Sequence, residues 1–104
     1  MAKRTVRLAE EANRNADAIY AWIAERSTSG AHRWYRNLFK ALDRLANDAE
    51  CFAEAPESHR FDETIRNVSF RMRSGSVYRL VFTISGDEVH VLCLRGPGQD
   101  WVVP

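Results

Sequence analysis

The sequence has few of the features that mark secreted, membrane-spanning or disulfide-stapled proteins. Its 104 residues include only two cysteines, Cys51 and Cys93, which are too few for a disulfide framework. No apolar run approaches the ~18 residues of a membrane span. The basic start, Met1-Ala2-Lys3-Arg4, is not followed by the apolar core of a signal peptide, because charged residues come directly after Leu8 and Ala9. We therefore expect a cytoplasmic protein with reduced thiols.

The chain also lacks an excess of charge of one sign. It has 15 basic and 14 acidic residues, which gives a formal net charge of +1. Dominant nonspecific binding to nucleic acid needs a larger excess of lysine and arginine. The overall charge therefore gives that function no support, although it leaves room for a local basic patch.

Motifs for metal, cofactor or nucleophilic chemistry are missing as well. The three histidines are scattered, and neither cysteine has a companion at the spacing of a zinc site. Gly96-Pro97-Gly98 lacks the Gly-Lys-Ser/Thr of a phosphate loop, and we interpret it as the end of a strand. No Gly-x-Ser-x-Gly elbow presents a nucleophile. We expect neither a metal nor a small-molecule cofactor.

Apolar residues make up 45% of the chain, which is enough for a single ordered domain over residues 1–104. Apolar positions recur every three or four residues in two segments, which predicts helices, and alternate in others, which predicts strands. The expected elements are a strand at 5–8, helices at 10–26 and 31–50, a polar connection at 51–64, and strands at 65–73, 77–84 and 88–95. The prediction is an α+β fold of βααβββ order, in which an antiparallel two-helix hairpin packs on a small, mainly antiparallel sheet.

The second helix has the clearest apolar stripe. Its leucines Leu38, Leu42 and Leu45 lie at spacings of three and four, so they share one face. We expect this stripe to face the first helix and to be buried with Leu80 and Phe82. The serines and threonine before this helix, at 27–29, are candidates for its N-cap.

Four arginines of the expected sheet are the first candidates for function. Arg71 and Arg73 alternate with apolar residues, and Arg79 is the one charge in an otherwise apolar strand. Side-chain parity places these three on the face turned away from the helices, and Arg95 ends the last strand near the same edge. We refer to Arg71, Arg73, Arg79 and Arg95 as the sheet arginines.

Purely structural roles for these arginines remain open. A charged sheet face is commonly just solvated and balanced by nearby carboxylates. For Arg79, the structural alternative is an ion pair with Asp100 or Glu88 that ties strands together.

Two short apolar strands near the end of the chain, Tyr78-Arg79-Leu80-Val81-Phe82 and Val89–Arg95, carry one arginine each. A glycine-flanked proline and then Asp100-Trp101 follow them. Placed after two amphipathic helices, this order resembles the RelE/ParE toxins of bacterial type II toxin–antitoxin modules over nearly the whole chain. The resemblance implies a toxin that is neutralised by a cognate antitoxin, and a role in plasmid stabilization.

In the RelE-like branch, basic side chains on the open sheet face support cleavage of mRNA on the ribosome, and the sheet arginines are the matching positions here. Arginine can stabilise phosphate charge but is a poor base, and cleavage also needs a proton acceptor and a donor. The only lysines, Lys3 and Lys40, lie off the sheet. The C-terminal tyrosine of these ribonucleases is absent from this sequence, and Trp101 is the residue nearest to its position.

The ParE-like branch is the better match, because its members keep the Tyr-Arg-Leu-Val-Phe type of strand and the Arg…Asp ending without the ribonuclease set. Characterised members poison DNA gyrase by binding it and perform no chemistry. The resemblance thus implies a gyrase inhibitor and not an enzyme, with a ribosome-dependent mRNA endonuclease as the enzymatic alternative. The residues expected to contact the target or the antitoxin are Arg71, Arg73, Arg79, Arg95, Asp100 and Trp101.

Either branch implies an antitoxin whose disordered C-terminal segment folds along the toxin. A helical segment needs an apolar groove, whereas an extended one can add to a sheet edge. Trp22 and Trp34 are candidates to line such a groove, unless they flank the helix–helix core. A third possibility stays open, namely a non-toxic binding module of the same fold.

Overall fold

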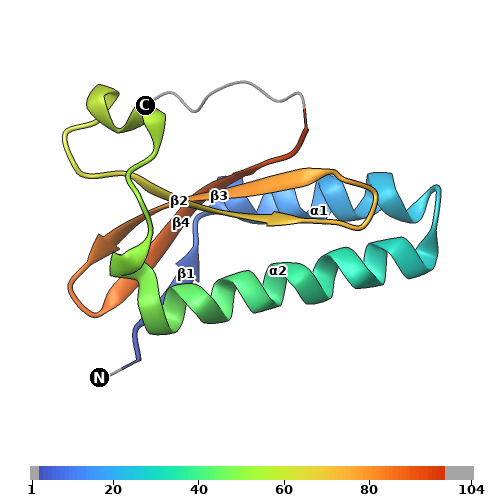
Figure 1. Ribbon diagram of the computed structural model, residues 1–104, viewed down its shortest axis with the longest axis horizontal. Coiled ribbons are helices and arrows are strands. Elements are labelled where there is room, and N and C mark those ends of the chain that lie inside the picture. Colours follow the sequence, from blue (N-terminus) through green and yellow to red (C-terminus); the bar gives the residue numbers. More distant parts are fainter. Residues whose placement is uncertain (1–2, 98–104) are drawn as a thin grey trace.

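In the computed structural model, which describes residues 3–97, two helices cover one face of a four-stranded sheet (Figure 1). The elements are β1 (Thr5–Leu8), α1 (Glu10–Ala24), α2 (Thr28–Asp48), the 3-10 helices η1 (Ala49–Cys51) and η2 (Pro56–Arg60), β2 (Arg66–Arg71), β3 (Val77–Ser85) and β4 (Glu88–Arg95). The predicted α+β class and the βααβββ order are confirmed.

The strand order in the sheet is β1-β4-β3-β2. The last three strands form an antiparallel meander, as predicted, and β1 pairs in parallel with β4, with Thr5 opposite Glu88. The N-terminal strand therefore lies beside the C-terminal one, and β1 and β2 are the two edge strands.

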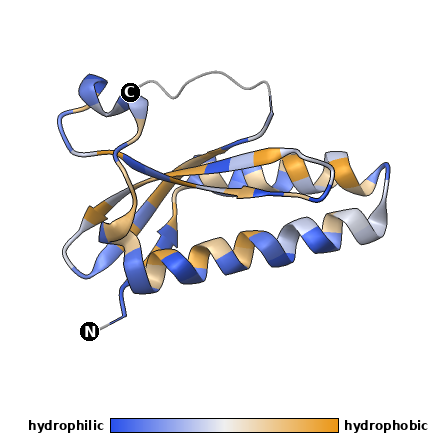
Figure 2. Ribbon diagram, in the orientation of Figure 1, coloured by the Kyte–Doolittle hydropathy of each residue, from blue (hydrophilic) through white to orange (hydrophobic). Residues whose placement is uncertain are grey.

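The helical hairpin is held by a tight connection. The Ser27 side chain caps α2 by accepting a hydrogen bond from the backbone N–H of Gly30 (2.9 Å), which confirms a predicted capping role. The helix begins at Thr28, three residues earlier than expected. On α1 the buried residues are the small Ala12 and Ala16, which allow the helix to approach the sheet closely. Apolar and polar residues alternate in bands along α2 (Figure 2).

The main core lies between the helices and the sheet. Leu38 and Leu45 are buried with Leu80 and Phe82, as the apolar stripe predicted. Leu42 is only half-buried and packs against the edge of this core, so the expectation of full burial is wrong for that residue. The stripe also includes Trp34, which is fully buried against Phe70 and Tyr78.

The connection between α2 and β2 differs from the prediction, because it is not simply a polar loop. It crosses to the sheet face opposite the helices, which we call the second face. There Ala55 and Ile65 form a small apolar cluster with Val81 and Cys93, and all four are buried. Part of the face that was expected to be open is therefore covered.

β2 also ends earlier than predicted, at Arg71. The backbone N–H of Met72 donates to the carbonyl of Ser76 (2.8 Å), and that of Gly75 donates to the carbonyl of Met72 (2.9 Å), which closes a turn. Gly75 has a φ of 96°, a conformation that side chains other than hydrogen disfavour. Arg73 consequently lies in the turn and not in the strand. None of the helices within residues 3–97 combines the length and the apolar content that a membrane span requires.

Candidate functional site

A hollow of about 290 Å³ opens on the second face where η2 lies over the sheet. Its lining residues are Pro56, Asn67, Ser69, Val77, Arg79, Arg95 and Gly96. Two of the sheet arginines, Arg79 and Arg95, meet here because they are opposite one another in the β3–β4 ladder. We call this cavity the arginine hollow.

Arg79 does not project freely into this hollow, because it is bound by a carboxylate from η2. Its Nη1 and Nη2 donate to Oε1 and Oε2 of Glu57, at 2.9 and 2.5 Å, in a two-pronged ion pair. Nη1 also donates to Oδ1 of Asn67 (3.1 Å). The Glu57 side chain is fully buried, and its hydrogen bonds raise the pKa of Arg79 above its ordinary value.

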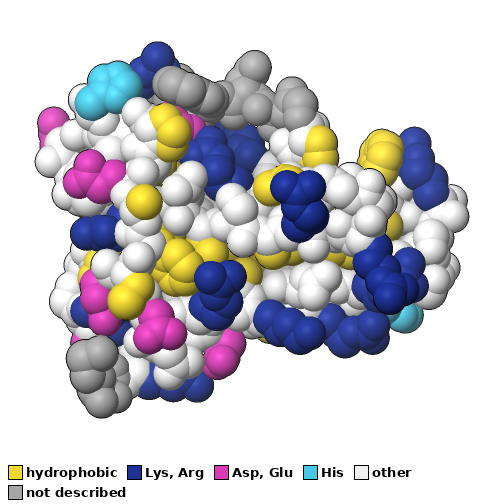
Figure 3. All heavy atoms as spheres, viewed as in Figure 1, with side chains coloured by type: hydrophobic (Ala, Val, Ile, Leu, Met, Phe, Trp, Pro, Cys, Tyr) yellow, Lys and Arg dark blue, Asp and Glu magenta, His cyan; other side chains and the backbone are white. Residues whose placement is uncertain are grey.

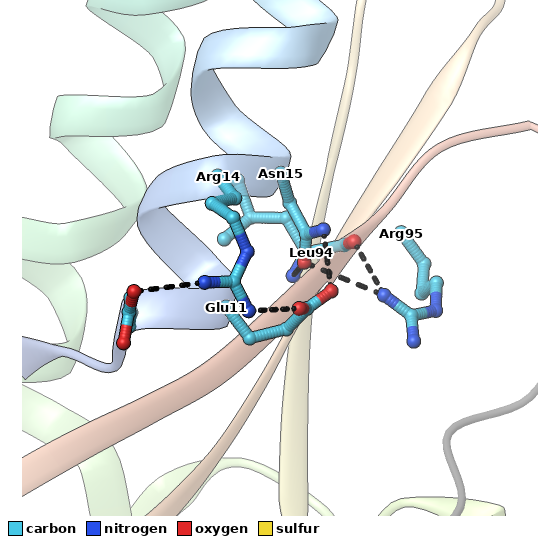
Figure 4. A network of polar contacts seen from close by, with 6 residues as sticks. Glu11, Arg14, Asn15, Leu94 and Arg95 are labelled. Carbon is cyan, nitrogen blue, oxygen red and sulfur yellow. Dashed lines mark hydrogen bonds and ion pairs between the residues drawn. The ribbon is translucent and has the colours of Figure 1, made fainter.

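Arg95 turns toward α1 from the end of β4. Its Nη1 donates to the carbonyl of Leu94 (3.1 Å) and to Oδ1 of Asn15 (3.4 Å), and that same oxygen accepts the backbone N–H of Leu94 (3.0 Å; Figure 4). Asn15 in turn donates to Glu11 (2.9 Å), and this bond, followed by one from Arg14, lowers the pKa of Glu11. β1 pairs with β4 only as far as Val91, and beyond that point the side chain of Asn15 on α1 binds the backbone of β4.

The remaining predicted site residues are not gathered in the hollow. Arg71 is exposed at the end of β2 on the second face, and Arg73 is exposed in the following turn. Asp100 and Trp101 lie outside the described residues. Of the two carboxylates considered as structural partners of Arg79, Asp100 and Glu88, the second is bound to Arg7 and His90.

The arginine hollow has few groups that could transfer a proton. Among the described residues that line it, none is a histidine, lysine, tyrosine or cysteine. Cys93 precedes Arg95 by two residues on β4, but burial raises the pKa of its thiol. Burial also raises the pKa of the Tyr78 phenol. In the described part of the chain, no group of three histidine, cysteine or acidic side chains could hold a metal ion.

The two tryptophans that were candidates for a groove have different environments. Trp34 belongs to the core, which is the structural alternative given above. Trp22 is 57% exposed, with the Arg26 guanidinium 3.7 Å from the centre of its ring. It lines a groove of about 380 Å³ with Ala18, Ile19, Ser76, Tyr78, Gly96 and Pro97.

Residues 6–101 match the family model described as "ParE toxin of type II toxin-antitoxin system, parDE". The chain belongs to the ParE toxin family. Membership in the ParE family confirms the resemblance inferred from the last quarter of the sequence, and it implies a cognate antitoxin as partner. A comparison with curated proteins gave no match.

Sequence reasoning missed the residues that hold the arginines of this ParE-family chain. Glu57, Asn67 and Asn15 were not singled out, since each acts on a residue at least twelve positions away along the chain. The only signal for Glu57 was its place directly after Pro56, a residue that favours the start of a helical turn.

Proposed function

We propose that this ParE-family toxin inhibits growth by binding DNA gyrase, performs no chemistry of its own, and is neutralised by its cognate antitoxin. The observation that carries the proposal is the ion pair between Arg79 and Glu57. It occupies the guanidinium that a ribonuclease of this fold would use to stabilise phosphate charge.

Cleavage of RNA makes demands that the arginine hollow does not meet. An attacking 2′-hydroxyl needs a proton acceptor, and the leaving oxygen needs a donor. The hollow presents two arginines, and the guanidinium group is suited to neither task, because it stays protonated in proteins. Its amide and hydroxyl, from Asn67 and Ser69, are suited to hydrogen bonding. This composition favours recognition of a protein surface over catalysis.

Two assays with purified protein test the proposal. Supercoiling by DNA gyrase should be inhibited, or cleaved DNA should accumulate with the enzyme, when the toxin is added. In a translating ribosome system the same preparation should leave the mRNA intact. Toxin-dependent mRNA cuts in phase with codons would instead establish the ribonuclease alternative.

Variants locate the contact on the toxin. Arg71→Ala with Arg73→Ala removes two exposed sheet arginines and is expected to weaken gyrase inhibition without unfolding the protein. Arg7→Ala with Arg14→Ala is the matched control, because it also removes two exposed cations, one from β1 and one from α1. Equal inhibition by the double variant and by the wild type would remove these arginines from the contact surface.

Expression in cells separates a toxin from a non-toxic binding module. Growth should stop on induction and resume when the product of the neighbouring reading frame is supplied. Normal growth at full expression, in the absence of that product, would leave only the binding module.

A further inference from the structure

A row of exposed cations runs along α2. Arg33, Arg36, Lys40 and Arg44 follow one another at spacings of three and four residues, so they share one face of the helix. Lysine and arginine side chains gather over α2 on the face shown in Figure 3. Within residues 3–97 none of these four has a carboxylate partner; Arg44 instead lies over the ring of Phe52. We call these four residues the α2 ridge.

Six other cations within residues 3–97 do have carboxylate partners: Lys3 with Asp43, Arg4 with Glu50, Arg7 with Glu88, Arg14 with Glu10 and Glu11, Arg26 with Glu25, and Arg79 with Glu57. Arg71 and Arg73, at the end of β2, resemble the α2 ridge in having no carboxylate partner in the described chain. The near-zero net charge therefore conceals a local positive field, and such a field favours an acidic ligand.

The α2 ridge lies beside an edge of the sheet. Asn37, on the same side of the helix as Arg33 and Lys40, donates from Nδ2 to the sulfur of Met72 (3.2 Å), which directly follows β2. Met72 and Phe70 are half-buried here and pack against the main core. Apolar surface and positive charge therefore meet at the β2 edge.

The backbone of β2 leaves part of that edge unpaired. Because the N–H of Met72 points to β3, alternation in an antiparallel ladder turns the backbone groups of Asn67, Ser69 and Arg71 outward. The N–H of Asn67 donates to the carbonyl of Ala53 (3.2 Å), so the connection covers the beginning of the edge. Ser69 and Arg71 have no such backbone partner among residues 3–97.

We propose that an acidic, extended segment of the cognate antitoxin adds to the edge of β2 at Ser69 and Arg71, with its carboxylates against the α2 ridge. This inference rests on the proposed neutralisation by an antitoxin. Strand addition supplies backbone hydrogen bonds, and side chains on one side of the added strand reach the neighbouring helix. A nucleic acid would meet the charges but could not continue the ladder of backbone bonds.

Binding of short end-blocked peptides, followed by fluorescence anisotropy, tests the chemistry directly. A peptide that alternates glutamate and valine should bind, with an affinity that falls as salt is raised. The same peptide with lysine in place of glutamate should not bind. A glutamate peptide with a proline in place of its central valine should bind more weakly, since proline removes a backbone donor. Equal binding by the lysine or the proline peptide overturns the proposal.

A charge-matched pair of variants tests the ridge. Arg36→Gln with Lys40→Gln should weaken binding of the glutamate peptide about fivefold, the scale expected for two exposed charge contacts. Arg7→Gln with Arg14→Gln removes the same charge from β1 and α1 and should leave binding unchanged. If both double variants lose affinity equally, the effect is one of net charge, and the ridge has no special role.

Amide hydrogen exchange tests the strand. The amides of Ser69 and Arg71 should gain protection when the glutamate peptide is added, whereas that of Phe70, which points to β3, should not change. Charge-dependent binding without this alternate protection overturns strand addition. So does a DNA duplex that displaces the peptide and is weakened by the same ridge variant, because the ridge would then be a nucleic-acid surface.

The purified antitoxin links the peptide result to neutralisation. It should bind the ridge variant more weakly than the wild type, and the charge-matched control as tightly. Full-strength binding to the ridge variant overturns this inference but leaves gyrase inhibition standing. Failure of the wild type to inhibit gyrase rejects the proposed function, while the peptide and exchange results are unaffected.

Discussion

Arg79 and Glu57 form a two-pronged ion pair that joins the beginning of β3 to the 3-10 helix η2, with N–O distances of 2.9 and 2.5 Å. Only 20% of the Arg79 side chain and none of the Glu57 side chain is exposed. Arg79, which the sequence indicated as a contact for the target or the antitoxin, thus also binds the connection that covers the second face.

Replacement of Arg79 by alanine is expected to lower the free energy of unfolding by about 3–5 kcal/mol, because it removes one side of a buried, two-pronged ion pair. This expectation replaces the near-native melting curve that an exposed contact residue would give. Chemical denaturation of the variant measures the loss.

Two further variants separate charge from packing at this position. Arg71→Ala, on the same face but exposed, should change stability little. Glu57→Leu combined with Arg79→Met removes both charges together and should be less destabilised than Arg79→Ala alone. An unfolding midpoint for Arg79→Ala equal to that of the wild type would show that the ion pair contributes no stability.

Two leucines of α2, which differ in burial, should differ in their contribution to the free energy of unfolding. Leu45→Ala should cost about 2–5 kcal/mol, since Leu45 is fully buried and its removal leaves a cavity. Leu42→Ala should cost less, because Leu42 is only half-buried at the edge of the core. Urea denaturation of both variants provides the comparison, and a larger loss for Leu42→Ala would contradict the packing described here.

The two free thiols should differ in reactivity. Cys93 is 2% exposed and burial raises the pKa of its thiol, so little thiolate is present near neutral pH. Cys51 is exposed at the end of η1. Iodoacetamide should therefore label Cys51 first in the folded protein, as peptide mass spectrometry would show. In denaturant the two rates should converge, and preferential labelling of Cys93 in the folded state would contradict its burial.

Glu88 should contribute to loss of stability in acid. A hydrogen bond from His90, and then one from Arg7, lowers its pKa below the ordinary value of 4.5. The unfolded chain binds a proton more readily than the folded one in this range, so the stabilisation is present above about pH 4.5 and is lost as the pH falls through the folded pKa.

The measurement is the thermal midpoint between pH 6 and about pH 3, in wild type and in Glu88→Gln. The variant should show a shallower decline in acid. Glu63→Gln is the control, because Glu63 is exposed and makes no hydrogen bond or ion pair within residues 3–97. Parallel curves for wild type and Glu88→Gln would assign the acid sensitivity to other carboxylates.

Local patterns predicted the elements because each reflects burial on one face. The alternation around Val68 and Leu80 placed Arg79 correctly on the face away from the helices, and the stripe of Leu38 and Leu45 identified the core side of α2. Strand and helix ends were less accurate, since Met72 and Arg73 continue the alternation although the backbone has already turned.

The candidate site was less accessible to such reasoning. The alternation shows where Arg79 points but not what meets it there. Its partner Glu57 comes from a segment without periodicity, and the two residues are joined only when the connection folds back over the sheet. Likewise, the spacing that defines the α2 ridge is visible in the sequence, but its position beside the β2 edge depends on the contact between Asn37 and Met72.

The parallel pairing of β1 with β4 sets an order for synthesis and folding. Thr5 finds its partner Glu88 only after both helices, β2 and β3 have been made, whereas the helical hairpin and the β2–β3 pair need only nearby segments. Such distant pairing raises contact order and slows folding. During translation β1 must wait for β4, so the sheet of the toxin is completed only after all three of the other strands have been made.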